Sequence, residues 1–146
     1  MRIDHWEIAL ERYIVEHTNT PFDYGTFDCA LFAAGSVLAI TGIDIAADYR
    51  TRYSTEDEAR AILAEVTGAP DATVETSLDD AATKFDFISA LPSVYFAQRG
   101  DVISLKVDGS PSLGIVALDG KHALFIGEGS LLRLPISKCN RAWRIG

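Results

Sequence analysis

One stretch, ALFAAGSVLAI at residues 30–40, constrains the fold more than any other part of the chain. It predicts a helix that is apolar on nearly every side, and such a helix is stable only when other elements bury it. The turn-forming run TNTPFDYG at 18–25 precedes it, and Gly42 follows as a C-cap. We therefore expect a buried central helix with Cys29 in its first turn.

Three further helices are predicted on either side of this central helix. Residues 3–17 carry apolar side chains at helical spacing, and Asp4 and Glu7 are spaced as in a capping box. Residues 54–67 open with the capping pattern STEDE and end at a glycine. A short fourth helix covers residues 77–85. Ser77 is its expected opening residue.

The hydrophobic period changes after Gly100, where short β-prone runs replace the helical spacing. Four such runs follow, at 102–107, 112–118, 122–126 and 131–136. The Asp119–Gly120 pair between the second and third runs is a strong hairpin signal. The run AWRI near the C-terminus adds a further strand, which we expect at an edge of the sheet.

The order of helices first and strands second predicts an α+β fold. We expect a single domain over residues 1–146, with a helical part over about 1–98 and an antiparallel β-meander over about 99–146. The length and the hydrophobic share of 48% are those of a chain with a substantial core.

The charge of the chain bears on its partners. The formal net charge is −8, and an acidic surface repels both DNA phosphates and anionic lipids. No apolar run reaches the roughly 18 residues of a membrane span. Asp4 and Glu7 lie where a signal peptide is apolar. We expect no nucleic-acid partner, no membrane insertion, no signal peptide, and synthesis in a cytoplasm.

Metal and cofactor sites have no clear signature. Cys29 and Cys139 are expected to be free thiols, and no two of the cysteines and histidines have the spacing of a zinc site. The acidic clusters 56–58 and 79–80 lie in first turns of predicted helices, where the helix dipole favours acidic residues. We interpret these clusters as structural and expect neither a metal nor a cofactor.

Cys29 is the candidate nucleophile. A thiol in the first turn of a helix lies at the positive end of the dipole, which favours the thiolate, so we expect a lowered pKa. Catalysis by cysteine also needs an imidazole within hydrogen-bond reach and a group that orients it. The alternative is a buried, inert cysteine that acts as a small hydrophobe.

The segments FDYGTFDCALFAAG, RGDVISL and SLGIVAL resemble the layout of NlpC-type papain-like cysteine peptidases, which cut peptidoglycan stem peptides. In that family an Asp-Cys pair opens the central helix, and Asp28 and Cys29 match it. A Gly-Asp pair opens the first strand, as 100–101 does here, and a His-x-Gly-Ile stretch follows on the next strand. The resemblance implies a papain-like fold, with the cysteine-bearing helix packed on the antiparallel strands.

The chain more closely resembles a divergent branch of that family, common in phage tail gene clusters. Members of the branch end in Cys-x-x-Ala-Trp-Arg, and Cys139 and residues 142–144 fit this ending. The resemblance implies a component of the phage tail tip or hub. Its location would be the virion, and its partners other tail proteins and bacterial peptidoglycan.

Ser112 stands where active members of the family carry the catalytic histidine. A serine hydroxyl cannot act as a base near neutral pH. The hairpin register places His122 opposite Ala117, about 16 Å along the strand from Ser112 at about 3.3 Å per residue. The same register places Leu124 opposite Ile115, near the position of the family's ring-orienting polar group.

The two remaining histidines, His5 and His17, lie on the first predicted helix. We interpret His17 as a solvated helix end, where a histidine complements the negative end of the dipole. Two hypotheses follow. The chain is a tail component that has the hydrolase fold but lacks the Cys-His dyad, or it is an active peptidoglycan-cleaving endopeptidase or amidase in which Cys29 acts with a non-standard base. The missing histidine favours the first.

Overall fold

The structure, a computed structural model, describes all residues 1–146 and is an α+β fold. Four helices come first: α1 (Trp6–His17), α2 (Cys29–Thr41), α3 (Glu56–Thr67) and α4 (Val74–Lys84). Six strands follow: β1 (Ile88–Ala90), β2 (Val102–Val107), β3 (Ser110–Val116), β4 (His122–Ile126), β5 (Leu131–Pro135) and β6 (Arg141–Ile145). Two short 3-10 helices are η1 (Val94–Phe96) and η2 (Ile136–Lys138). No helix has the length and apolar composition to cross a membrane.

The strands form one antiparallel sheet in the order β1-β6-β2-β3-β4-β5. The predicted meander is confirmed from β2 to β5. The prediction of an edge position for the last strand was wrong, because β6 inserts between β1 and β2. The edge strand on this side of the sheet is β1, whose three residues are too few to show a periodic pattern and lie within the stretch predicted to be helical.

The hairpin register predicted from the Asp119–Gly120 turn is confirmed. Ile115 lies opposite Leu124, and the backbone N–H of Ala117 donates to the carbonyl of His122 at 2.8 Å. The alternation of side chains along the two strands therefore follows the prediction.

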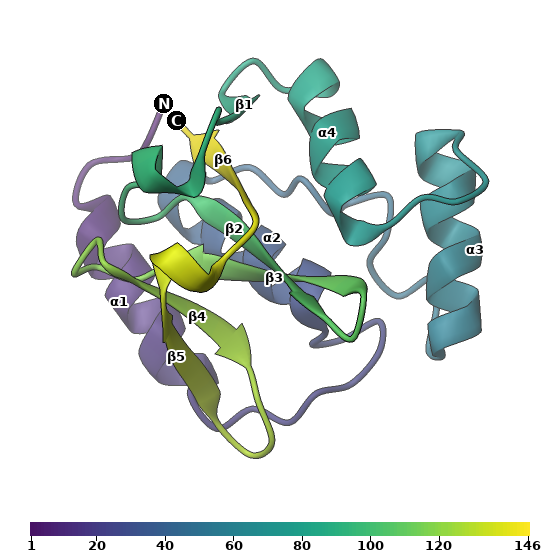
Figure 1. The fold of residues 1–146 in the computed structure, drawn as a ribbon, viewed down its shortest axis with the longest axis horizontal. Coiled ribbons are helices and arrows are strands. Elements are labelled where there is room, and N and C mark those ends of the chain that lie inside the picture. The colour runs from purple at the N-terminus through teal and green to yellow at the C-terminus, as the bar shows by residue number, and fades with distance from the viewer.

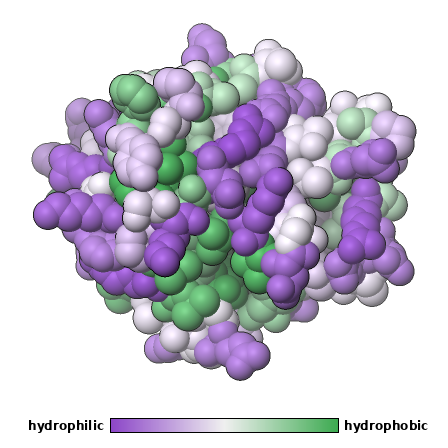
Figure 2. Space-filling model, viewed as in Figure 1, coloured by the Kyte–Doolittle hydropathy of each residue, from purple (hydrophilic) through white to green (hydrophobic).

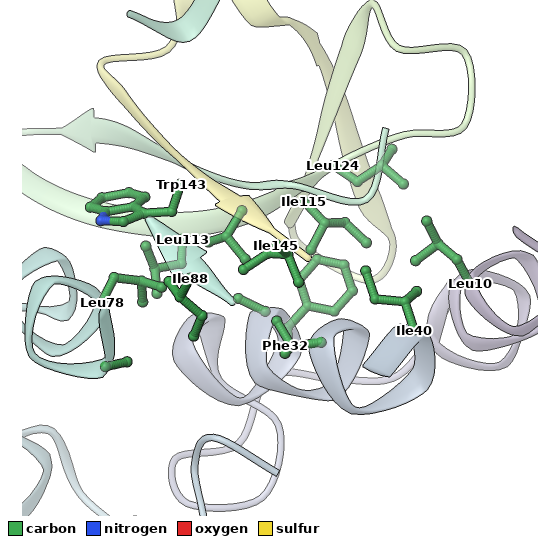
Figure 3. Close-up of a cluster of buried hydrophobic side chains, with 14 of the residues drawn as sticks. Leu10, Phe32, Ile40, Leu78, Ile88, Leu113, Ile115, Leu124, Trp143 and Ile145 are labelled. Carbon is green, nitrogen blue, oxygen red and sulfur yellow. The ribbon is translucent and has the colours of Figure 1, made fainter. Parts of the chain in front are cut away.

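Helix α2 is the buried centre of the molecule, as predicted. It packs against α1 on one side and against β3 and β4 on the other. Phe32, Val37 and Ile40 of this helix have no exposed surface. Figure 3 shows Phe32 and Ile40 packed below the sheet residues Ile115 and Ile145, with Leu10 of α1 at the side.

The opposite face of the sheet has no helical layer of comparable length. In Figure 1, α1 and α2 lie behind the sheet, and the segments that carry η1 and η2 cross its front. A second, smaller apolar cluster lies there and includes Ile103, Val116, Phe125 and Cys139. This face is mostly hydrophilic at its surface, with apolar areas over the sheet (Figure 2).

Helix α3 is the most peripheral element. None of its residues is fully buried, and its main packing partner is α4. It lies beyond α4 at the edge of the molecule in Figure 1. Its acidic first turn is exposed, as predicted, and Thr55 caps it by accepting from the N–H of Glu58.

The helix ends show where local patterns succeed and fail. Gly42 and Gly68 end α2 and α3 in the left-handed conformation, as predicted. The predicted capping box at α1 was wrong, because His5 occupies the N-cap with no side-chain bond. Helix α4 begins three residues before Ser77, because Thr73 and Thr76 form the capping box instead.

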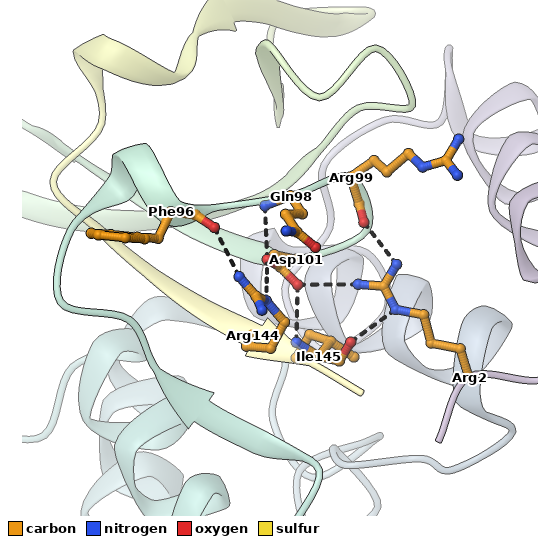
Figure 4. Close-up of polar contacts among 7 residues, drawn as sticks. All are labelled: Arg2, Phe96, Gln98, Arg99, Asp101, Arg144 and Ile145. Atoms are coloured by element: carbon orange, nitrogen blue, oxygen red, sulfur yellow. Dashed lines mark hydrogen bonds and ion pairs between the residues drawn. The ribbon is translucent and has the colours of Figure 1, made fainter.

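A buried carboxylate, Asp101, ties the ends of the chain to the sheet (Figure 4). Its side chain has no exposed surface. It accepts from the guanidinium groups of Arg2 at 3.1 Å and Arg144 at 3.0 Å. The backbone N–H groups of Gln98 and Ile145 donate to it at 2.8 and 3.0 Å. Four donors therefore compensate the cost of burying this charge.

We predict that Asp101→Ala lowers the free energy of unfolding by about 3 to 5 kcal/mol, because two arginines and two N–H groups lose their acceptor. Urea denaturation measures this loss. The control is Glu56→Ala, which removes the exposed Arg60–Glu56 pair and should cost less than about 1 kcal/mol. Equal losses in the two variants would contradict the role assigned to Asp101.

Candidate functional site around Cys29

Cys29 is the first residue of α2, and Asp28 is its N-cap. The Asp28 carboxylate is buried and accepts from the N–H groups of Leu31 at 2.9 Å and Gly25 at 3.1 Å. The hydroxyl of Tyr53 also donates to it. Gly25 is required here, because a Cβ on it would lie 1.9 Å from the carbonyl oxygen of Tyr53. Asp28 is therefore a positioning group that holds the start of the helix.

The thiol of Cys29 lies beside β3. This strand pairs with β2 over residues 110–115, but β4 pairs with it only at Ile115 and Val116. The stretch that contains Ser112 and Leu113 therefore has no strand partner on its β4 side. The Ser112 hydroxyl and the Leu113 N–H both lie close enough to the thiol to act on its ionisation.

Cys29 and Ser112 line a pocket of about 560 Å³. Its walls come from the first half of α2, the segment 45–53, α3, α4 and the start of β3. Most lining side chains are apolar, and examples are Leu31, Ala34, Ile45, Leu63, Leu78 and Leu113. Tyr24, Tyr49 and Tyr53 contribute phenol groups. The pocket has the size of a small-molecule site.

Burial raises the pKa of the Cys29 thiol above its ordinary value of 9.0. The negative charge of Asp28 raises the pKa further. The N–H groups of Leu113 and Ala30 and the hydroxyl of Ser112 lower it, but they do not offset the burial. The expectation of a lowered pKa was wrong, because the loss of solvation outweighs the field of the helix start.

None of the three histidines lines the pocket that holds Cys29. His122 lies at the β3–β4 turn, where its Nδ1 is 2.6 Å from Asp119. His5 is exposed at the start of α1. His17 ends α1, as predicted, but its ring is half-buried and stacks on Phe27 with centroids 5.0 Å apart.

The other candidate groups have structural roles. Asp79 binds the guanidinium of Arg141 with both oxygens and accepts from the indole of Trp143. Asp80 pairs with Lys84 one turn along α4. Both carboxylates have structural partners, but the first-turn position predicted for them was wrong, because α4 begins at Val74 and its acidic first-turn residue is Glu75. No three Cys, His, Asp or Glu side chains are grouped so that they could hold a metal ion.

Sequence reasoning missed the tyrosines of the pocket. Tyr53 reaches Asp28 from 25 positions away, and Tyr49 lies on the same connecting segment. This segment has no regular hydrophobic period, so no sequence pattern indicates which of its side chains face α2. The one available signal is the presence of two tyrosines four residues apart beside a helix start.

We predict that the rate of alkylation of Cys29 by iodoacetamide reaches half its maximum above pH 9.0, the ordinary value for a thiol. A raised pKa leaves less thiolate at any given pH, and only the thiolate reacts. The Cys139→Ala variant leaves Cys29 as the one thiol, so mass spectrometry reports its rate directly. A midpoint below pH 8 would show an activated thiol.

Comparison with known proteins connects this site to one family. No curated protein and no solved structure matches the chain. A family model described as a domain of unknown function, DUF6950, matches residues 1–145. The match covers the helices, the whole sheet and every residue of the Cys29 pocket. The chain therefore belongs to the DUF6950 family.

Proposed function

We propose that the chain is a component of a phage tail tip or hub that has an NlpC-type papain-like fold but lacks the Cys-His dyad. Its Cys29 pocket binds a ligand and does not hydrolyse it through that dyad. Its partners are other tail proteins, with peptidoglycan as the surface that the tail meets.

Several local features support the NlpC-type fold. Asp28 and Cys29 open a central helix that packs on an antiparallel sheet, and Gly100 and Asp101 open β2. Gly114 lies on the next strand, where a Cβ would come within 2.4 Å of the carbonyl oxygen of Leu124. A side chain at this position would clash with β4, so this chain requires the glycine of the family's His-x-Gly-Ile stretch.

The side chains that line the pocket around the thiol are the main support for the absence of the dyad. On β3, the side chain beside the thiol is that of Ser112, which carries a hydroxyl. No imidazole lines the pocket. The thiol pKa is raised, whereas a Cys-His pair lowers it. Leu124 is buried and apolar, so it offers no group to orient a ring.

The assignment to a phage tail rests on the resemblance to the branch found in tail gene clusters. The residues of its Cys-x-x-Ala-Trp-Arg ending have structural roles in this chain. Cys139, Ala142 and Trp143 are buried, and Arg144 pairs with Asp101. This ending therefore supports membership of a common fold, whereas it carries no chemistry of its own.

We predict that the purified protein releases no more stem peptides from peptidoglycan than its Cys29→Ala variant does. Mass spectrometry of the soluble fraction measures the release. Virions that carry Cys29→Ala should assemble and infect normally. Release that is lost in Cys29→Ala would instead support the alternative, an endopeptidase or amidase with Cys29 as nucleophile and a non-standard base.

We predict that Ser112→His raises the alkylation rate of Cys29 at pH 7 by roughly tenfold or more, because an imidazole beside a thiol stabilises the thiolate. Ser112 lines the pocket of about 560 Å³, so the new side chain would face this space. The matched control is Ser110→His, which places the same ring two residues earlier on β3. An unchanged rate in Ser112→His would mean that position 112 is not the place of a catalytic base.

A further inference from the structure

The wall of the Cys29 pocket contains a polar group that the fold does not use. The hydroxyl oxygen of Tyr49 is fully buried, and no group of the protein bonds with it. Leu31, Ala34 and Ala46 form an apolar cluster against which this ring packs. An unpaired buried hydroxyl costs stability, so a phenylalanine would suit a purely structural wall better. The wall is therefore not explained by packing alone.

The charges around the pocket disfavour anions. Three acidic residues line it, Asp28, Glu56 and Asp71, whereas Arg60 is the one basic residue of the lining. The guanidinium of Arg60 is already paired with Glu56 at 2.7 Å. An entering carboxylate or phosphate would meet excess negative charge and no free cation.

The pocket disfavours cations as well. The Asp28 carboxylate is buried and saturated by three donors, and Asp71 is exposed at the rim. Most of the remaining surface is apolar, where a charged group loses its hydration without a partner. The ligand that fits is uncharged and mainly apolar.

Tyr24 offers a hydroxyl donor for recognition, in a lining that also includes the hydroxyls of Ser110 and Ser112. Tyr24 lines the pocket near Cys29, and its hydroxyl makes no hydrogen bond within the protein. Its ring is held edge-on to Phe22, with centroids 4.8 Å apart. A neutral acceptor, such as the carbonyl of an amide or ester, is the complement of this hydroxyl.

We propose that the Cys29 pocket binds an uncharged, mainly apolar molecule that carries an amide or ester carbonyl, and that Tyr24 donates a hydrogen bond to this carbonyl. The inference deepens the proposed function and rests on it, since the ligand is bound and not cleaved.

The experiment is a titration of the full chain, labelled with ¹⁵N, followed by NMR at pH 7. Three probes of the same chain length are compared: octanamide, octanoate and octylammonium. We expect octanamide to bind tightest and to shift the amide signals of the pocket, among them Leu31 and Leu113. Tighter binding of octanoate or of octylammonium than of octanamide would overturn the assignment of a neutral ligand.

Two pairs of variants locate the ligand. Ala59→Trp, on the pocket side of α3, should abolish binding of octanamide, whereas Ala61→Trp on the exposed side should leave it unchanged. Because α3 has no fully buried residue, both variants should fold, and the dispersion of the NMR spectrum checks this. Tyr24→Phe should weaken binding roughly two- to tenfold, against no change in the exposed control Tyr95→Phe. Equal affinities within either pair would overturn the site.

Failure of this inference and failure of the proposed function are separable. If the wild type releases stem peptides but octanamide binds as expected, the proposed function fails and the pocket assignment stands. If no stem peptides are released and Ala59→Trp binds octanamide normally, the pocket assignment fails and the proposed function stands.

Discussion

The buried carboxylate of Asp101 is the interaction on which the arrangement of the sheet depends. It joins Arg2 near the N-terminus, the start of β2, and Arg144 with Ile145 near the C-terminus. Arg2 and Ile145 are 143 positions apart in the chain, and the carboxylate fixes β6 beside β2. Because β3 follows β2 through a short hairpin, the position of β2 also fixes where Ser112 lies along the first turn of α2. The geometry around Cys29 is thus determined partly from the other end of the molecule.

The features that the sequence predicted well are those decided by local physics. The apolar composition of residues 30–40 identified α2, and one Asp-Gly turn was sufficient to predict that Ile115 faces Leu124. The features missed depend on distant partners. The insertion of β6 between β1 and β2 is decided by contacts of Trp143 and Arg144 with Asp79 and Asp101, which leave no periodic signal. The structure brings the Ser112 hydroxyl beside the Cys29 thiol, and no spacing rule alone would have brought the two together.

Two opposing effects determine the pKa of Cys29, the helix start and burial, and the amino-acid sequence does not show which is larger. A helix start stabilises a negative charge by about 0.3 to 1 kcal/mol at an exposed site. Burial can shift a pKa by several units, and each unit corresponds to about 1.36 kcal/mol. The sign of the net effect therefore depends on how much water reaches the thiol, and that is set by β3 and by the pocket walls. A helix-start cysteine is a sign of a reactive thiol only when a compensating group also enters the pocket.

The peripheral position of α3 has a consequence for the motions of the molecule. A helix without any fully buried residue, packed chiefly on one neighbour, belongs to the least stable part of a structure and opens well before the global fold does. This helix forms one wall of the Cys29 pocket, whereas α2 and the sheet form its floor. The wall formed by α3 is therefore less stable than the floor. Amide hydrogens of α3 should exchange with solvent through local opening, at a rate independent of the stability that Asp101 confers on the rest. How firmly the pocket stays closed around the thiol therefore depends in part on the stability of this one helix.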